Sequence, residues 1–130
     1  MKVLLKSLSA LTLILTAATS FAMPEHLTTH NLTNTESNAF VAGHIPSPYP
    51  TPANSSRQVY WNMVRLACFG YTTDNKCSAL IKMDTNTPNP VELGTVTMDL
   101  TTGDIQPKQM SNNGYTMTVN GPGETTITRD

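Results

Sequence analysis

Charged side chains are scarce in this sequence. Lys and Arg together number eight and Asp and Glu nine, so charged residues make up 13% of the 130 residues. Neither sign is clustered, whereas nucleic acids and anionic lipid surfaces are bound through concentrated basic patches. The sequence therefore predicts no nucleic-acid partner. Its polar character comes instead from uncharged Thr, Asn and Ser, which suits the exposed faces of β-strands.

Long apolar runs are equally rare, and the one present spans residues 8–18. Lys2 and Lys6 precede it and the small residues Ser20 and Ala22 follow, which is the pattern of a cleaved secretory signal peptide. The run is shorter than the roughly 20 residues that a transmembrane helix requires. We therefore expect residues 1–22 to be removed. The remaining chain, with no integral membrane segment, is expected to be secreted or periplasmic.

Cysteine occurs only twice, at Cys68 and Cys77. In an exported chain such a pair predicts one structural disulfide, because the compartment is oxidising. Eight intervening residues do not make the Cys-x-x-Cys pair of an oxidoreductase, and no second pair completes a zinc site. On the chain-entropy model, a loop this short stabilises the fold by about 2.5 to 3 kcal/mol.

Catalytic motifs are missing as well. No Gly-x-Ser-x-Gly elbow, His-Glu-x-x-His helix or cysteine nucleophile organises the Ser, His and Asp residues present. Asp99 and Asp104 flank a predicted hairpin, but on an exposed turn they would have little reason to act as acid and base. The sequence therefore predicts no enzymatic activity and no cofactor.

The stretch around the two cysteines is the most informative part of the chain. It reads as a disulfide-stapled β-hairpin, in which residues 66–68 lead into a turn at residues 71–75 and residues 77–83 return. A helix is the alternative, because Ser55 and Gln58 fit a capping box and residues 59–67 carry apolar side chains at helical spacing. The many β-formers and the short span between the cysteines favour the strand.

Residues 23–56 form a segment rich in Pro, Thr and Asn, with weak strands expected at residues 27–33 and 39–45 that could pair with each other. Prolines then occupy every second position from Pro46 to Pro52, so this piece must be extended. It is expected to connect one sheet to another. The alternative is a polyproline II ligand anchored by Tyr49.

Histidines are confined to this same part of the chain. His26 and His30 are four residues apart beside Glu25, which makes them weak candidates for binding copper or zinc. Surface histidines are the favoured interpretation, because a closed metal site needs about four ligands and none complete this one. No metal site is therefore predicted.

Residues 57–130 are expected to form the β core. Apolar positions change parity at Gly94, which predicts a β-bulge, and Gly103 is placed for a tight hairpin turn. Residues 105–110 should form an edge strand because of Pro107. Alternation over residues 115–120 predicts a half-buried strand, and residues 125–129 a final one.

Together these features predict an all-β fold, a small antiparallel β-sandwich or partly open barrel with one disulfide-stapled hairpin. The expected role is a non-enzymatic binding or interaction module for an unknown protein or glycan. Alternatives are an envelope-associated structural subunit that assembles by strand addition at residues 105–110, or a small secreted hydrolase or inhibitor. The candidate binding surface comprises His44, Tyr49, Thr72, Thr73, Asp74 and Asn75.

Overall fold

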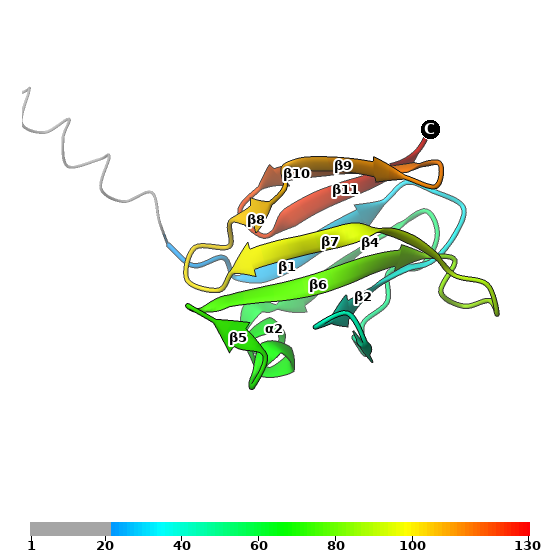
Figure 1. Cartoon of the computed structure of the whole chain (residues 1–130). Helices are drawn as coiled ribbons and strands as arrows, with labels where there is room; N and C mark the ends of the chain where they lie inside the picture. Colours follow the sequence, from blue (N-terminus) through cyan, green and yellow to red (C-terminus); the bar gives the residue numbers. More distant parts are fainter. Residues whose placement is uncertain (1–21) are drawn as a thin grey trace, which may run out of the picture.

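The computed structural model describes residues 22–130, so the expected signal peptide lies outside the described residues except for Ala22. Two β-sheets face each other as a sandwich (Figure 1), which confirms the predicted all-β, antiparallel-rich class. The first sheet has five strands in the order β4-β1-β11-β10-β9. Its strands are β1 (His26–Asn31), β4 (Ser55–Tyr60), β9 (Gln109–Asn112), β10 (Tyr115–Gly121) and β11 (Glu124–Arg129).

The second sheet has six strands, five of them in the order β3-β2-β6-β7-β8, with β5 paired to β6. Its strands are β2 (Ser37–Val41), β3 (Ile45–Pro46), β5 (Thr72–Thr73), β6 (Lys76–Met83), β7 (Val91–Asp99) and β8 (Ile105–Gln106). The Gly94 bulge is present as predicted, because the register with β6 shifts there. Gly94 has a φ of 153°, and a side chain there would collide with Met110.

The two weak N-terminal strands exist, but the expectation that they pair with each other is wrong. β1 lies in the first sheet, antiparallel to β4 and parallel to β11, whereas β2 lies in the second sheet beside β6. The buried Asn31 amide fixes the crossing between them by donating to the carbonyl oxygens of Thr35 (2.7 Å) and Pro52 (3.2 Å). A satisfied buried amide of this kind holds a loop in one arrangement.

The proline-rich segment makes the predicted crossing from the second sheet to the first. It leaves β2 through a turn, forms the edge strand β3, bridges Ser37 at Thr51 and then enters β4. The alternating prolines suit this path, because an edge strand and a connection need few donors from their own N–H groups.

The predicted strand at the first cysteine is wrong: Trp61–Cys68 forms the α-helix α2. Trp61, Val64 and Cys68 are its buried residues, and their spacing places one face of the helix against the sandwich. This pattern of burial outweighs the β-propensity of the individual side chains. The disulfide therefore joins the end of a helix to a strand rather than the two legs of a hairpin.

A smaller hairpin does form just before β6. β5 pairs with the start of β6 through a two-residue turn at Asp74 and Asn75, which have φ angles of 53° and 60°. Asn and Asp tolerate this left-handed conformation better than other residues with a side chain. The turn predicted at residues 71–75 is thus present, but its first strand is β5 and not residues 66–68.

The expected single edge strand at residues 105–110 is divided between the sheets. β8 pairs with β7 at the edge of the second sheet, and β9 pairs with β10 at the edge of the first. Pro107 lies between them after a cis peptide bond. Because Pro cannot donate a ladder hydrogen bond, the change of sheet occurs where the ladder is already interrupted.

Buried apolar side chains form two clusters. The sheet core, which lies between the strands, comprises Ile81, Met83, Leu93, Val96, Ile105, Tyr115, Met117 and Ile127. The helix core, which lies under α2, comprises Val41, Trp61, Val64, Cys68, Cys77 and Leu100. Leu27 and Met98 pack against both clusters, so the two cores are continuous.

Candidate interaction surface

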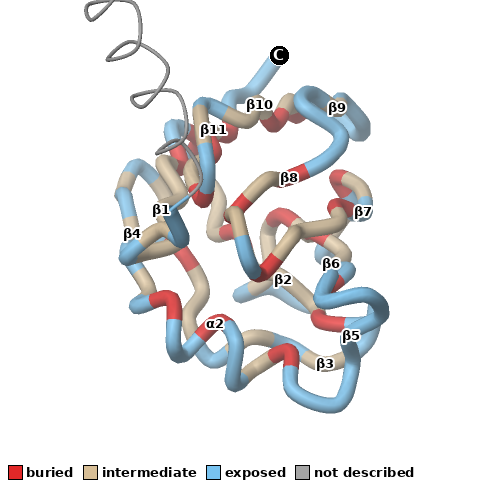
Figure 2. Tube along the Cα trace, turned by 90° about the vertical axis from the view of Figure 1, so that its left-hand side faces the viewer, coloured by how far each residue is buried: buried red, intermediate tan, exposed pale blue. Residues whose placement is uncertain are grey.

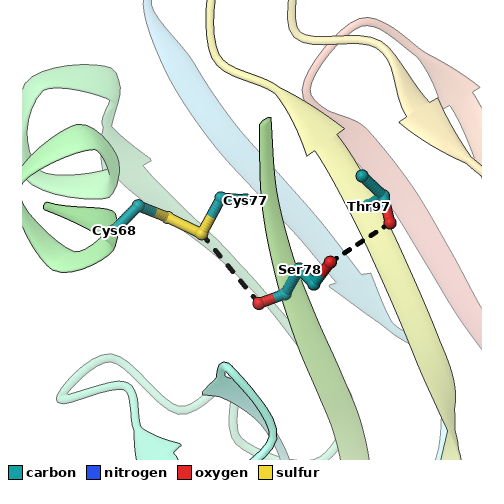
Figure 3. Close-up of a disulfide and its surroundings, with 4 residues drawn as sticks. All are labelled: Cys68, Cys77, Ser78 and Thr97. Carbon is teal, nitrogen blue, oxygen red and sulfur yellow. Dashed lines mark hydrogen bonds between the residues drawn. A yellow bond between two sulfur atoms is a disulfide. The ribbon is translucent and has the colours of Figure 1, made fainter. Parts of the chain in front are cut away.

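Three bonds fix α2 to the rest of the molecule. Cys68 at its last turn is joined to Cys77 on β6 (Figure 3), with the two Cα atoms 6.0 Å apart, which confirms the predicted disulfide. At the other end, the buried Trp61 indole donates from Nε1 to the Leu100 carbonyl oxygen at 3.0 Å. The Trp61 backbone N–H donates to the carbonyl oxygen of Glu25 at 2.9 Å.

The opposite side of α2 is exposed and carries apolar side chains beside the polar Asn62 and Arg65. Phe69 has 81% of its surface accessible and Leu66 has 65%, and Met63 and Tyr71 are also exposed. Met63 and Leu66 are three residues apart and therefore neighbours on the helical surface, and Phe69 and Tyr71 follow in the segment between α2 and β5. We call Met63, Leu66, Phe69 and Tyr71 the α2 patch. In Figure 2 the chain around α2 and β5 is mostly pale blue, which marks exposed residues.

The structure brings two parts of the predicted binding surface beside this patch. His44, in the turn between β2 and β3, contacts Tyr71 edge to face, with ring centroids 6.4 Å apart. Tyr71 directly precedes the exposed hairpin that contains Thr72, Thr73, Asp74 and Asn75. Tyr71 therefore links His44 to this hairpin. The sequence predicts Tyr71 in a turn and indicates no part in binding for it.

Tyr49 lies apart from those residues and is half-buried. The Arg57 guanidinium carbon is 5.5 Å from the centre of its ring, and Arg57 Nη1 donates to the neighbouring Pro50 carbonyl oxygen at 3.1 Å. Tyr49 is also one wall of a surface groove between α2 and the proline-rich segment, opposite Met63, Leu66 and Ala67. Tyr49 therefore lines the groove and is not the exposed anchor that a polyproline II ligand would need.

The two weak metal candidates lie on the outer face of the first sheet. His30 is held between Ser56 Oγ and Glu124 Oε2, each 2.7 Å from one of its ring nitrogens. His26 contacts the ring of Tyr60, with centroids 4.8 Å apart. Over residues 22–130 the structure shows no group of three or more His, Cys, Asp or Glu side chains arranged to hold a metal ion.

The two carboxylates that flank the β7–β8 turn serve the turn itself. Asp99 Oδ1 accepts from the backbone N–H groups of Thr101 (2.8 Å) and Thr102 (3.2 Å). Asp104 accepts from the side chains of Lys108 and Gln106, and these hydrogen bonds, that from Lys108 first, lower the pKa of Asp104. A carboxyl group whose pKa is lowered is poorly suited to act as a general acid near neutral pH.

Comparison with known proteins identifies a family and a solved structure that are similar to this chain. A family model described as the type II secretion system substrate NttC matches residues 1–130. A search of curated proteins found no match. Among solved structures, the crystal structure of the Legionella pneumophila type II secretion system substrate NttC is 63% identical. That match covers 82% of this chain and 99% of the other, with a TM-score of 0.82.

The chain belongs to the NttC family of type II secretion system substrates. Proteins exported by this route pass through the periplasm and are secreted, so the predicted location is confirmed. The disulfide agrees with that location, because the periplasm and the exterior allow thiols to be oxidised. Within residues 22–130 no helix has the length and apolar character to cross a membrane.

Sequence reasoning missed the α2 patch. Assigning residues 61–68 to a strand divided the apolar residues between two faces, and no outward apolar row then resulted. The signal was nevertheless present, because Trp61, Val64 and Cys68 fit a buried helical face and leave Leu66 and Phe69 outside it. Apolar residues at positions outside this buried helical face indicate an exposed patch.

Proposed function

We propose that this secreted protein is a non-enzymatic binding module that docks a protein partner through the α2 patch. The observation that carries the proposal is the exposure of four large apolar side chains close to the disulfide, Met63 and Leu66 on α2 and Phe69 and Tyr71 in the short segment after it. Scattered exposed apolar residues are ordinary, whereas a contiguous apolar patch is typical of an interaction site.

The chemistry of the patch suits a protein surface. Aromatic residues and Met are enriched in the centres of protein interfaces, and burying an exposed Leu or Phe side chain contributes about 1.5 to 3 kcal/mol. The aliphatic Met63 and Leu66 lie beside the apolar groove formed with Ile45, Pro46 and Pro48. An apolar side chain of the partner would fit this groove, which favours a protein over a glycan.

The surroundings of the patch supply a polar rim. His44 contacts Tyr71, and the exposed residues Thr72, Thr73, Asp74 and Asn75 continue from it. Interfaces commonly combine an apolar centre with a polar, solvent-accessible rim. In addition, the disulfide and the Trp61 hydrogen bond hold the patch in place before binding, which reduces the ordering that binding must offset.

The hydrogen bonds of the polar groups support binding over catalysis. The carboxylates of Asp99 and Asp104 are engaged within their own turn, and both ring nitrogens of His30 already have partners. Each of these groups has a structural task. Binding, unlike general acid–base catalysis, does not require a side chain with a shifted pKa.

The double variant L66S/F69S tests the proposal, with L32S as its matched control. Leu32 is also exposed, at 61%, but precedes Thr33 in the loop after β1 and lies outside the patch. The wild-type protein and both variants are immobilised and exposed to proteins of the cell's own envelope and medium, and each retained protein is then titrated. We expect L66S/F69S to weaken a genuine partner at least about tenfold, because each interface hot spot contributes more than about 1 kcal/mol.

L32S should bind that partner as wild type does. Equal binding by all three proteins, or binding only to glycans in a parallel panel, would contradict the proposal. Light scattering over a range of concentrations adds a further check. A dimer that L66S/F69S abolishes would assign the patch to a second copy of this chain and would also contradict a separate partner.

A further inference from the structure

A cavity of about 120 Å³ lies between the two sheets. Its walls come from the inward residues of both sheets and are mainly apolar, among them Leu27, Val59, Ile81, Val96, Met117 and Ile127. An apolar cavity of about 150 Å³ engineered in another protein stays dry and takes up benzene. The space in this sandwich is somewhat smaller and suits an apolar group of about five carbon atoms.

The cavity adjoins the groove beside α2. Five residues line both the cavity and the groove: Val41, Ser47, Tyr49, Met63 and Ala67. Entry therefore lies between the helix and the proline-rich segment. Asn38, Ser47, Thr51 and Arg57 are polar residues in the cavity lining. Arg57 is near the groove, because its guanidinium carbon lies 5.5 Å from the ring centre of Tyr49, which lines both spaces.

Arg57 is the only positively charged residue among those that line the cavity. It alternates with Ser55 and Val59 on the inner, half-buried side of β4, and it is paired in register with Thr29, which also lines the cavity. One of its N–H groups donates to the Pro50 carbonyl oxygen. In the part of the chain that the structure describes, no carboxylate lies within ion-pair distance of Arg57.

We propose that this cavity binds a free monocarboxylic acid with an apolar body of about five carbons. The body lies between the sheets and the carboxylate is bound by the Arg57 guanidinium at the entrance. Charge complementarity carries the choice, because a guanidinium has five donors in a planar fork that matches a carboxylate. The cavity shares Met63 with the α2 patch, but Arg57 lies outside the patch and Phe69 outside the cavity, so either proposal can fail without the other.

Hexanoate and 1-hexanol are the probes, and methyl-labelled methionines are the reporters. Met63, Met98 and Met117 line the cavity, so a ligand inside it must shift their methyl resonances. The probes are titrated into the disulfide-bonded secreted protein up to about 10 mM. This concentration is above the dissociation constants expected for ligands of this size. We expect both probes to perturb Met98 and Met117, and hexanoate to bind at least about tenfold more tightly than hexanol.

The variant R57Q separates the role of the charge from that of the cavity. It should lower the affinity for hexanoate by about tenfold or more and leave the affinity for hexanol unchanged, because only the acid contacts the guanidinium. A79L fills the cavity from β6 and should lower both affinities at least about tenfold. If A79L does not fold, A39L fills the same cavity from β2.

F69S should leave hexanoate binding unchanged, because Phe69 lines neither the cavity nor the groove, and this distinguishes the cavity from the α2 patch. The proposal is wrong if hexanoate leaves the Met98 and Met117 resonances unperturbed. It is equally wrong if R57Q binds hexanoate as wild type does, or if the cavity-filling variants retain full affinity, because the acid would then be bound at the surface.

Discussion

The sheet core and the helix core are held together in different ways. The sheet core draws its eight buried residues from five strands, and its strands are paired along most of their length. The helix core has six buried residues, two of which are the disulfide cysteines, and its helix is only eight residues long. A helix of this length is not stable by itself in water.

This difference connects stability with binding. Strands that bury one face of alternating residues have few large apolar side chains left to expose, whereas α2 buries three residues and leaves Leu66 and Phe69 in solvent. A covalent tie allows a short helix to keep its place while the apolar side chains of Met63 and Leu66 remain exposed. The region that carries the candidate interaction surface is therefore also the one most dependent on the disulfide.

Substituting Ile127 in the sheet core should have the largest effect. Ile127 is 1% exposed on β11, and I127A removes its packing and leaves a cavity, so we expect a loss of about 2 to 5 kcal/mol in unfolding free energy. Urea unfolding followed by Trp61 fluorescence and by circular dichroism measures it. Both probes should report one transition, because Leu27 and Met98 link the two cores.

T128A is the matched control, since Thr128 is the next residue on the same strand and is exposed. It should change the unfolding free energy by less than about 0.5 kcal/mol. An I127A protein in which the Trp61 signal outlasts the loss of β-structure would show that the helix core is stable independently, contrary to the expected single transition.

Removing the disulfide should have the next largest effect and should act on one region first. C68A/C77A is expected to lower the unfolding free energy by about 2.5 to 3 kcal/mol, because the unfolded chain regains the freedom of the closed loop. Hydrogen exchange should show the largest loss of protection in α2 and β5, and a smaller one in β10 and β11. Equal loss of protection in all four elements would contradict a local role for the tie.

The same contrast decides how much could be predicted from the sequence. The sheet core was largely predictable, because alternation over Tyr115, Met117 and Val119, the parity change at Gly94 and the turn at Gly103 all act within a few residues. The parallel pairing of β1 with β11 was not predictable in this way. It joins segments nearly a hundred residues apart, and neither carries a local signal for its partner.

The helix core was mispredicted for a related reason. Trp61 and Val64 favour strands by themselves, and burial against Val41 and Leu100 selects the helix. Because the site depends on that helix, Leu66 and Phe69 were missed while the loop residues His44 and Thr72 to Asn75 were chosen on polarity and turn chemistry. The choice of candidate residues in a loop does not depend on whether the neighbouring element is a strand or a helix. The choice of residues on a helical face does.

The smallest expected effect concerns the turn that joins the two cores, between Leu100 and Ile105. Hydrogen bonds from Lys108 and Gln106 lower the Asp104 pKa from its ordinary value of 3.8, so the charged carboxylate is stabilised by folding. A lowered pKa contributes stability that is present above the unfolded-state value and is lost as the pH falls through the folded-state value. Because Asp104 is largely exposed, the contribution should be less than about 1 kcal/mol.

Comparing D104N with wild type across pH measures this contribution. Wild type should be slightly more stable at pH values above about 4, and the difference should disappear as the pH falls toward about 2. D74N is the matched control, since Asp74 is exposed and its carboxylate makes no side-chain hydrogen bond with residues 22–130. A D104N difference that grows on acidification would reverse the sign and contradict the Lys108 hydrogen bond as its cause.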